Sequence, residues 1–287
     1  MFTIVFNPAA GNKKIDQILK KVCVILTGRH INYTTFEISA KQGPEVYQAI
    51  PCGNDDTVCI LGGDGTVLHT FNKLSGDSFR LMIVPCGTGN DFIKSLGLPK
   101  DPIKAFISQL NGETRHADYL TANKRCFLNV MGAGFDVNVL CKLNAFKHKF
   151  SGLKAYLMAV IQSIKEYSPI ELDINADDTG FVKKKLSIIS IGNGRFIGGG
   201  MKAVPSAVPD DGLIDVVEVR AIKRWQLLFL LPLFICGLHI KFGLGKSYRC
   251  RSLRLASAGL TYQLDGEIFS DDSVTVNLIP DRLRVFK

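Results

Sequence analysis

Several patterns that define common classes of site are missing from this chain. None of the eight cysteines forms a CxxC pair or a short cluster, and the five histidines show no spacing typical of metal ligands. Most cysteines lie in apolar runs, which favours buried free thiols over disulfides or a zinc site. There is no helix-turn-helix, zinc-finger or RNP pattern, so we expect no nucleic acid partner.

Long apolar runs are missing as well. The most apolar stretch, residues 225–240, is shorter than the ~20 residues that span a bilayer, and Pro232 and Gly237 interrupt it. Basic residues flank it, and Trp225, the single tryptophan, stands at its entrance. Two interpretations stay open: a core helix, or a helix whose outer face touches lipid headgroups. The first residues lack the basic region of a signal peptide and predict a strand, which indicates a cytoplasmic protein.

Two glycine-rich turns each follow a short apolar run. Residues 62–66 read Gly-Gly-Asp-Gly-Thr, and residues 86–91 read Cys-Gly-Thr-Gly-Asn-Asp. Glycine reaches positive φ and carries no Cβ, so such turns bring backbone N–H groups close to an anion. Asp64 and Asp91 add carboxylates that suit Mg²⁺ or a hydroxyl group. One such turn is as often an ordinary strand end, but two in one chain predict a phosphate site and therefore a nucleotide.

These turns resemble motifs of the diacylglycerol kinase catalytic-domain family, which binds ATP without a Walker A loop and has an NAD kinase-like fold. The resemblance continues along the chain in the order and spacing of the family. It includes a first nucleotide loop at 6–11, a glycine segment at 192–200, a metal loop at 209–215 and a catalytic turn at 264–267. Together the motifs are similar to those of bacterial diacylglycerol kinase-like lipid kinases, without indicating one lipid.

The resemblance implies ATP and Mg²⁺ as cofactors and assigns roles to individual residues. The nucleotide site would comprise Asn7, Pro8, Ala9, Ala10, Gly11, Ser39, Gly62, Gly63, Asp64, Gly65, Thr66, Val67, Leu68, Thr88 and Asn90. Mg²⁺ would bind Asp211 and the carbonyl oxygens of Val208 and Leu213, with Asp64 linked to metal through water. Glu267 would accept the proton of the acceptor hydroxyl, with Asp265 as its close partner. Taken alone, residues 264–267 fit a plain β-turn equally well.

The order of the expected elements predicts two domains. Up to residue 119, short apolar runs alternate with helical stretches, which predicts a parallel sheet covered by helices, a three-layer α/β nucleotide-binding domain. Residues 120–287 contain short strand-like runs separated by turns, with one helix at 151–166, which predicts an antiparallel β-sandwich. We expect the active site in the cleft between the domains, and a short final segment that returns to the first domain.

Positive charge is concentrated in the second half of the chain. Of the net charge of +9, residues 1–123 contribute +1 and residues 124–287 contribute +8. The excess includes a run of lysines at 183–185. This charge indicates either a generally solvated basic face or, more specifically, peripheral contact with the anionic inner face of the cytoplasmic membrane.

Three functions remain open on the sequence. The first is a membrane-visiting lipid kinase that uses ATP and Mg²⁺ to phosphorylate diacylglycerol or a related lipid alcohol. The second is a soluble kinase of the same fold, as NAD kinase is, and the third is a non-catalytic nucleotide- or lipid-binding regulator. The carboxylates Asp64, Asp211, Asp265 and Glu267 are all present, which favours catalysis. Both a monomer and a homodimer are compatible with the sequence.

Overall fold

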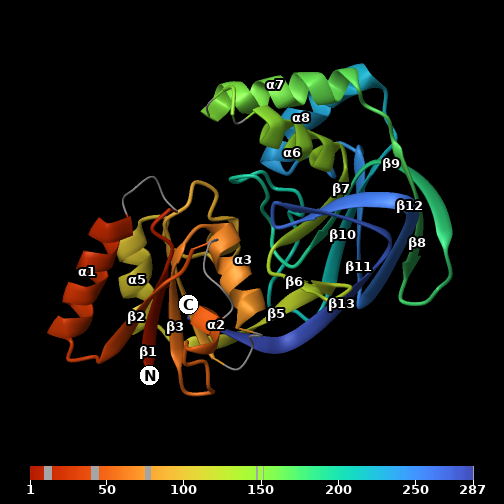
Figure 1. The fold of residues 1–287 in the computed structure, drawn as a ribbon. Coiled ribbons are helices and arrows are strands. Elements are labelled where there is room, and N and C mark those ends of the chain that lie inside the picture. Colours follow the sequence, from red (N-terminus) through yellow and green to blue (C-terminus); the bar gives the residue numbers. More distant parts are fainter. Residues whose placement is uncertain (10–14, 40–44, 75–78, 147, 151, 287) are drawn as a thin grey trace. The chain divides into compact units, whose positions relative to one another are not determined.

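The chain folds into two units in the computed structural model. The structure describes residues 1–9, 15–39, 45–74, 79–146, 148–150 and 152–286. Unit 1 contains the chain up to Tyr119, the segment Val208–Gly212 and the stretch from Ile279 onward. Unit 2 contains Leu120–Ala207 and Leu213–Leu278. Figure 1 shows the elements of each unit.

Unit 1 is built on a parallel sheet with the strand order β4-β3-β1-β2. Its strands are β1 (Phe2–Phe6), β2 (Tyr33–Glu37), β3 (Thr57–Gly62) and β4 (Arg80–Pro85). Its helices are α1 (Ile15–Gly28), α2 (Glu45–Gln48), α3 (Asp64–Lys73), α4 (Asp91–Ser95) and α5 (Pro102–Asn111). Every residue of β3 is buried, as expected for a parallel strand covered by helices on both faces.

The helices of unit 1 cover the two faces of this sheet (Figure 1). Ile15, Val22 and Leu26 of α1 share one apolar cluster with Phe106 of α5 and with side chains of β1, β3 and β4. Helix α3 lies on the other side of the strands in Figure 1. The predicted three-layer α/β domain is thereby confirmed.

Unit 2 is an antiparallel β structure. Its strands are β6 (Arg125–Phe127), β7 (Val130–Gly134), β8 (Ile170–Ala176), β9 (Val182–Gly192), β10 (Ile214–Arg220), β11 (Gly245–Cys250) and β12 (Ser252–Leu264). Strand β5 (Thr114–Ala122) leads into this unit, and β13 (Glu267–Phe286) leads out of it. Both β7 and β8 pair with β9 and with β12, so the strands form a branched antiparallel sheet. The predicted β-sandwich-like second domain is confirmed.

Three helices cover part of unit 2. They are α6 (Phe135–Phe146), α7 (Gly152–Lys165) and α8 (Leu227–Cys236), the last preceded by a 3-10 turn at Arg224–Gln226. All three contribute to one apolar core with β7, β9 and β10.

The structure differs from the predicted elements in three places. The pattern of residues 91–110 predicts one helical stretch, but the structure has two helices there, because Gly97 at φ 74° ends α4 and Asp101 caps α5 ahead of Pro102. Helix α6 and strand β11 were missed; α6 begins directly after Gly134, whose φ is 108°. The final strand continues past residue 279 into unit 1, to which a short returning segment was expected, and there Arg284 and Val285 pair with β4.

Candidate active site

Three strands of unit 1 end at the same edge of the sheet. Phe6 lies opposite Leu61, and Gly62 lies opposite Pro85, so Asn7, Gly63 and Cys86 each begin a loop there. Asn7 closes the first loop on itself, since its Oδ1 accepts a hydrogen bond of 3.0 Å from the N–H of Ala9. The carboxyl edge of a parallel sheet is the usual place for ligands in α/β folds.

The two glycine-rich turns are in direct backbone contact. A Cβ atom built on Gly87 would lie 2.5 Å from the Cα of Gly63, and one built on Gly63 would lie 3.0 Å from the Cα of Gly87. The N–H of Cys86 also donates to the carbonyl of Gly62 over 2.9 Å. Only residues without a side chain can be this close, so the glycines are needed for packing as well as for access to an anion.

Asn90 fixes the second turn from within. Its φ of 51° lies in the left-handed region, which Asn tolerates better than most residues. Its Oδ1 accepts from the N–H of Gly87 over 3.0 Å, and its Nδ2 donates to the Gly87 carbonyl over 2.7 Å. Asn90 was predicted both to contribute to the nucleotide site and to fix the second loop; its side-chain hydrogen bonds hold the loop closed, and its contact with a nucleotide stays a prediction.

Asp64 connects the first turn to the second. Its Oδ1 accepts hydrogen bonds from the N–H groups of Asp91 (2.7 Å) and Phe92 (3.2 Å), at the start of α4. Burial and the nearby charge of Asp91 raise the pKa of Asp64 above its ordinary value, although the backbone bonds act in the opposite direction. Asp91 is itself buried and pairs with Lys94 over 3.0 Å.

The start of α3 presents backbone N–H groups without a side-chain cap. Gly63 is the N-cap residue and supplies no side chain, and space is open around the Cα of Gly65. The first N–H groups of a helix have no partner within the helix, and the helix dipole adds positive potential there. Such an end favours phosphate.

The predicted metal loop is held by a residue that the motifs did not indicate. Asp118 is 1% exposed, and its Oδ2 accepts from the N–H of Gly212 over 2.8 Å. Its Oδ1 accepts from the N–H of Asp281 over 2.8 Å, and its own N–H donates to the Pro209 carbonyl over 2.6 Å. Asp211 lies in this loop with an exposed side chain.

In unit 2, residues 264–267 form the turn between β12 and β13, with Leu264 paired to Glu267. Asp265 and Gly266 at its centre have φ values of 46° and 95°. The carboxylate of Asp265 accepts backbone N–H bonds of 2.8–3.2 Å, donated by Leu128, Asn129 and Val130. Glu267 is exposed at the first position of β13. The turn therefore has one carboxylate engaged by the backbone and one directed to solvent.

Asn129 joins this turn to the predicted glycine segment. Its carbonyl accepts N–H bonds of 2.9 Å from Asn193 and Gly194, and its side chain donates to the carbonyl of Phe196. Asn193 returns a bond of 3.0 Å to the Leu128 carbonyl. In the sequence, the local signal for this role is a single asparagine between the apolar pairs at 127–128 and 130–131, and Asn129 is buried in the structure.

The other predicted site residues differ in exposure. Val67 and Leu68 are buried residues of α3, whereas Thr88 is exposed and Ser39 is half-buried. Ala10 and Gly11 lie outside the described residues. Within the described ranges there is no group of three or more His, Cys, Asp and Glu side chains placed to bind a metal.

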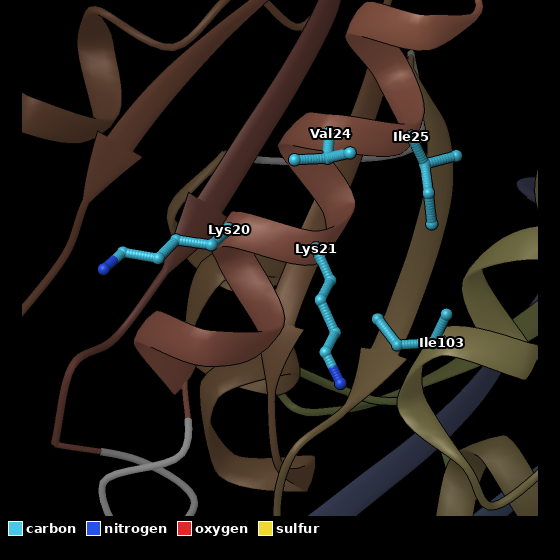
Figure 2. A pocket seen from close by; sticks show the side chains of 5 residues that line it. All are labelled: Lys20, Lys21, Val24, Ile25 and Ile103. Atoms are coloured by element: carbon cyan, nitrogen blue, oxygen red, sulfur yellow. The ribbon is translucent and has the colours of Figure 1, made fainter.

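A shallow groove of about 370 Å³ lies elsewhere on unit 1 and contains none of the predicted site residues. Figure 2 shows its lining by Lys20, Lys21, Val24 and Ile25 of α1 and by Ile103 of α5. As for membrane spans, the helices in the described part of the chain are all too short or too polar to cross a bilayer.

Comparison with known proteins covers both units. Residues 1–122 match the family described as diacylglycerol kinase catalytic domain, and residues 129–287 match the YegS C-terminal NAD kinase beta sandwich-like domain. A "Diacylglycerol kinase" of Mycobacterium tuberculosis is 27% identical over 81% of this chain and 77% of its own length. A Pseudomonas fluorescens protein named "Probable lipid kinase YegS-like" is 31% identical over 84% of this chain and 80% of its own.

Solved structures share the fold. A diacylglycerol kinase structure from Bacillus anthracis matches 99% of this chain and 96% of its own, with a TM-score of 0.75 at 18% identity. An NAD kinase from Archaeoglobus fulgidus, solved in complex with ATP, matches 100% of this chain and 94% of its own, with a TM-score of 0.53 at 13% identity. The NAD kinase-like fold expected from the motifs is confirmed.

Proposed function

The chain belongs to the bacterial diacylglycerol and lipid kinase family, and on this premise we propose that it transfers the γ-phosphoryl group of ATP to a hydroxyl group of diacylglycerol or a related lipid. Membership of a kinase family implies the use of ATP. The observation that carries the proposal is the backbone contact of Gly63 with Gly87, because it joins two phosphate-type turns at one sheet edge.

The nucleotide phosphates bind unit 1 in this proposal. The uncapped N–H groups at the start of α3 are the principal donors, and the bare backbone of Gly65 admits a phosphate oxygen at close range. Asp64 and Asn90 act on the ligand by keeping the two turns in register, as their hydrogen bonds indicate. The Asn7 loop lies at the same edge and supplies further polar groups.

Glu267 is the proton acceptor in the proposed reaction. The lipid oxygen attacks the γ-phosphorus, the bond from that phosphorus to the β–γ bridging oxygen breaks, ADP leaves, and the hydroxyl proton passes to Glu267. The contacts of the two carboxylates support this assignment. Those of Asp265 are with backbone N–H groups, whereas Glu267 is exposed. Asp265 then serves as a positioning residue that fixes the turn on which Glu267 stands.

The loop around Asp211 suits Mg²⁺ by the chemistry of its donors. An exposed carboxylate and backbone carbonyls are the oxygen ligands that a hard cation prefers, and Asp118 restrains the loop that offers them. Asp211 with the carbonyl oxygens of Val208 and Leu213 would hold the ion. Its contribution when bound is positive charge that neutralises phosphate oxygens and stiffens the loop.

A lipid acceptor locates the reaction at a membrane surface, and we propose the cytoplasmic face. ATP and Mg²⁺ are abundant there, and all eight cysteines are free thiols, as is usual in a reducing compartment.

The test is phosphoryl transfer by the purified protein with ATP and Mg²⁺, using wild type and Glu267→Gln. The acceptors are diacylglycerol, monoacylglycerol, a sphingoid base, phosphatidylglycerol and undecaprenol in anionic mixed micelles, and NAD in solution. Transfer to one lipid that Glu267→Gln abolishes supports the proposal and identifies the substrate. Transfer to NAD alone would replace it with a soluble kinase, and bound ATP with no transfer to any acceptor would favour a non-catalytic regulator.

A further inference from the structure

Helix α8 is apolar around its whole circumference, although only one side of it is buried. Its sequence from Leu227 to Cys236 contains no charged or amide side chain. Leu227, Leu230 and Phe234 are buried in the core of unit 2. A helix at the surface of a water-soluble unit ordinarily carries polar residues on its outer side, so the composition of α8 requires another explanation.

The outer side of α8 continues into the residues before and after it. The exposed fractions are 60% for Leu228, 63% for Phe229 and 46% for Ile235. Trp225, 58% exposed, packs edge-on against Phe229, and Leu238 and Phe242 beyond the helix are also exposed. We refer to Trp225, Leu228, Phe229, Ile235, Leu238 and Phe242 as the α8 apolar face. Large exposed apolar side chains gathered in one short segment mark a site of contact with a protein or a membrane.

The charged residues of the sequence segment that contains this face have one sign, and the exposed acid next to it in space, Glu166, pairs with Lys142. The sequence has no Asp or Glu between Glu218 and Asp265, but eight Lys and Arg residues fall in that interval. Lys223 and Arg224 precede α8, Lys241 follows it, and all three are exposed. The predicted lysine run at 183–185 is different, because Lys184 pairs with Glu218 and Lys185 with Glu171. The basic charge near α8 therefore complements an anionic surface better than the lysine run does.

We propose that the α8 apolar face docks on an anionic lipid bilayer, with its apolar side chains at the headgroup and acyl boundary and Lys223, Arg224 and Lys241 against lipid phosphates. Ten residues of helix extend about 15 Å, which is half the thickness of the hydrocarbon core of a bilayer. Helix α8 therefore lies in the membrane interface and does not span the bilayer. Tryptophan at the edge of an apolar helix favours the same depth. The docking rests on the proposed function. It deepens that function by naming the surface of the protein that approaches the lipid.

A second copy of the chain is the competing occupant. In a two-fold symmetric dimer the same patch faces itself, so the basic group of Lys223, Arg224 and Lys241 on one copy would approach the same group on the other. Like charges facing one another at an interface are unfavourable. The basic flanks thus favour a lipid surface over self-association.

Trp225 is the only tryptophan and makes the test direct. Without ATP, we expect vesicles of phosphatidylglycerol and phosphatidylcholine to shift its emission to the blue and to carry the protein in flotation, and bromine-labelled acyl chains to quench it. The double variant Leu228→Ser with Ile235→Ser should weaken partitioning into vesicles roughly tenfold or more. The double variant Lys223→Gln with Arg224→Gln should remove most of the salt dependence of vesicle binding. Phe181→Ser with Val182→Ser, at residues 56% and 55% exposed on another part of unit 2, is the matched control and should bind as wild type does.

Three results would overturn the docking. The first is that vesicles neither shift the Trp225 emission of the wild type nor carry it in flotation. The second is that Phe181→Ser with Val182→Ser loses as much vesicle binding as Leu228→Ser with Ile235→Ser. The third is a dimer in sedimentation that Leu228→Ser with Ile235→Ser dissociates while vesicle binding persists. Thermal melting of each variant checks the fold. Turnover of a water-dispersed short-chain diacylglycerol separates the two proposals. Turnover without vesicle binding rejects the docking alone, and vesicle binding without turnover on any acceptor rejects the kinase alone.

Discussion

Gly63 and Gly87 lie in the turns that follow two different strands, β3 and β4, and their backbones meet with no side chain between them. A Cβ on Gly87 would lie 2.5 Å from the Cα of Gly63, closer than real Cβ contacts occur. The obstacle is backbone, which cannot rotate away as a side chain does. The separation of the two turns, and with it the arrangement of the N–H groups at the start of α3, depends on this contact.

We predict that Gly87→Ala pushes the turns apart and weakens ATP binding at least tenfold, with a loss of roughly 1–3 kcal/mol in stability from overpacking. Isothermal titration with ATP and chemical unfolding measure the two effects. The control is Gly28→Ala at the end of α1, where an added Cβ meets nothing within 4 Å. Equal ATP affinity in Gly87→Ala and Gly28→Ala would show that the contact does not shape the nucleotide site.

Glu267 and Asp265 should differ in what their substitution changes. Because Glu267 is exposed, Glu267→Gln should leave the melting temperature close to that of wild type while kcat falls by about two orders of magnitude or more. Asp265→Asn replaces one acceptor oxygen by a donor that faces backbone N–H groups, so it should cost roughly 1.5–3 kcal/mol of stability as well as activity. Normal stability in Asp265→Asn would contradict the positioning role of Asp265. A large loss of stability in Glu267→Gln would contradict a purely catalytic role for Glu267.

The sequence was sufficient for the framework of this site because its determinants are local. An apolar run followed by Gly-Gly-Asp-Gly predicts a buried strand and a tight turn, and β3 with the start of α3 has that form. The same reasoning applied to β4 and the turn closed by Asn90. Both loops follow parallel strands, so their meeting at one edge also followed from the fold class.

The residues that support the site were not predictable in this way. Asp118 acts on Gly212 and Asp281, which are 94 and 163 residues away in sequence. The partnership of Asp265 with Glu267 stays a prediction, whereas the bonds from Asp265 back to residues 128–130 were not foreseen. No local spacing encodes such contacts, because they depend on where two distant backbone segments come together. Single-sequence reasoning therefore finds the loops but not the long-range hydrogen bonds that hold their carboxylates.

Asp118 provides the third prediction, on metal dependence. Asp118→Asn should release the 208–212 loop, lower stability by roughly 1–3 kcal/mol and raise the Mg²⁺ concentration needed for half-maximal activity. Asp211→Asn should raise the Mg²⁺ concentration needed for half-maximal activity, because the exposed carboxylate is the proposed ligand of the ion. Asp55→Asn, an exposed residue of another turn, is the control. An unaltered Mg²⁺ titration in both Asp118→Asn and Asp211→Asn would remove this loop from metal binding.

The buried carboxyl group of Asp136 gives a prediction on pH. It lies over the Cα of Gly132 and near the side-chain amide of Gln263, and both of its oxygens are buried from solvent. Burial raises the pKa of Asp136 to about 7, although the N–H groups of Val137 and Asp136 offset part of the effect. The folded state thus keeps a proton that the unfolded state releases near the ordinary value of 3.8.

The sign of the pH effect follows from this difference in bound protons. Between about pH 4 and pH 7 the folded state holds more protons than the unfolded state, so stability falls as pH rises, by at most about 1.4 kcal/mol per pH unit, and levels off above pH 7. Asp136→Asn removes the titration. Urea unfolding at pH 5, 6, 7 and 8 should therefore show wild type losing stability relative to Asp136→Asn across this window. Asp16→Asn, an exposed carboxyl of α1, is the control and should run parallel to wild type. Parallel curves for wild type and Asp136→Asn would mean that Asp136 is ionised in the folded protein, which requires a partner that neutralises it.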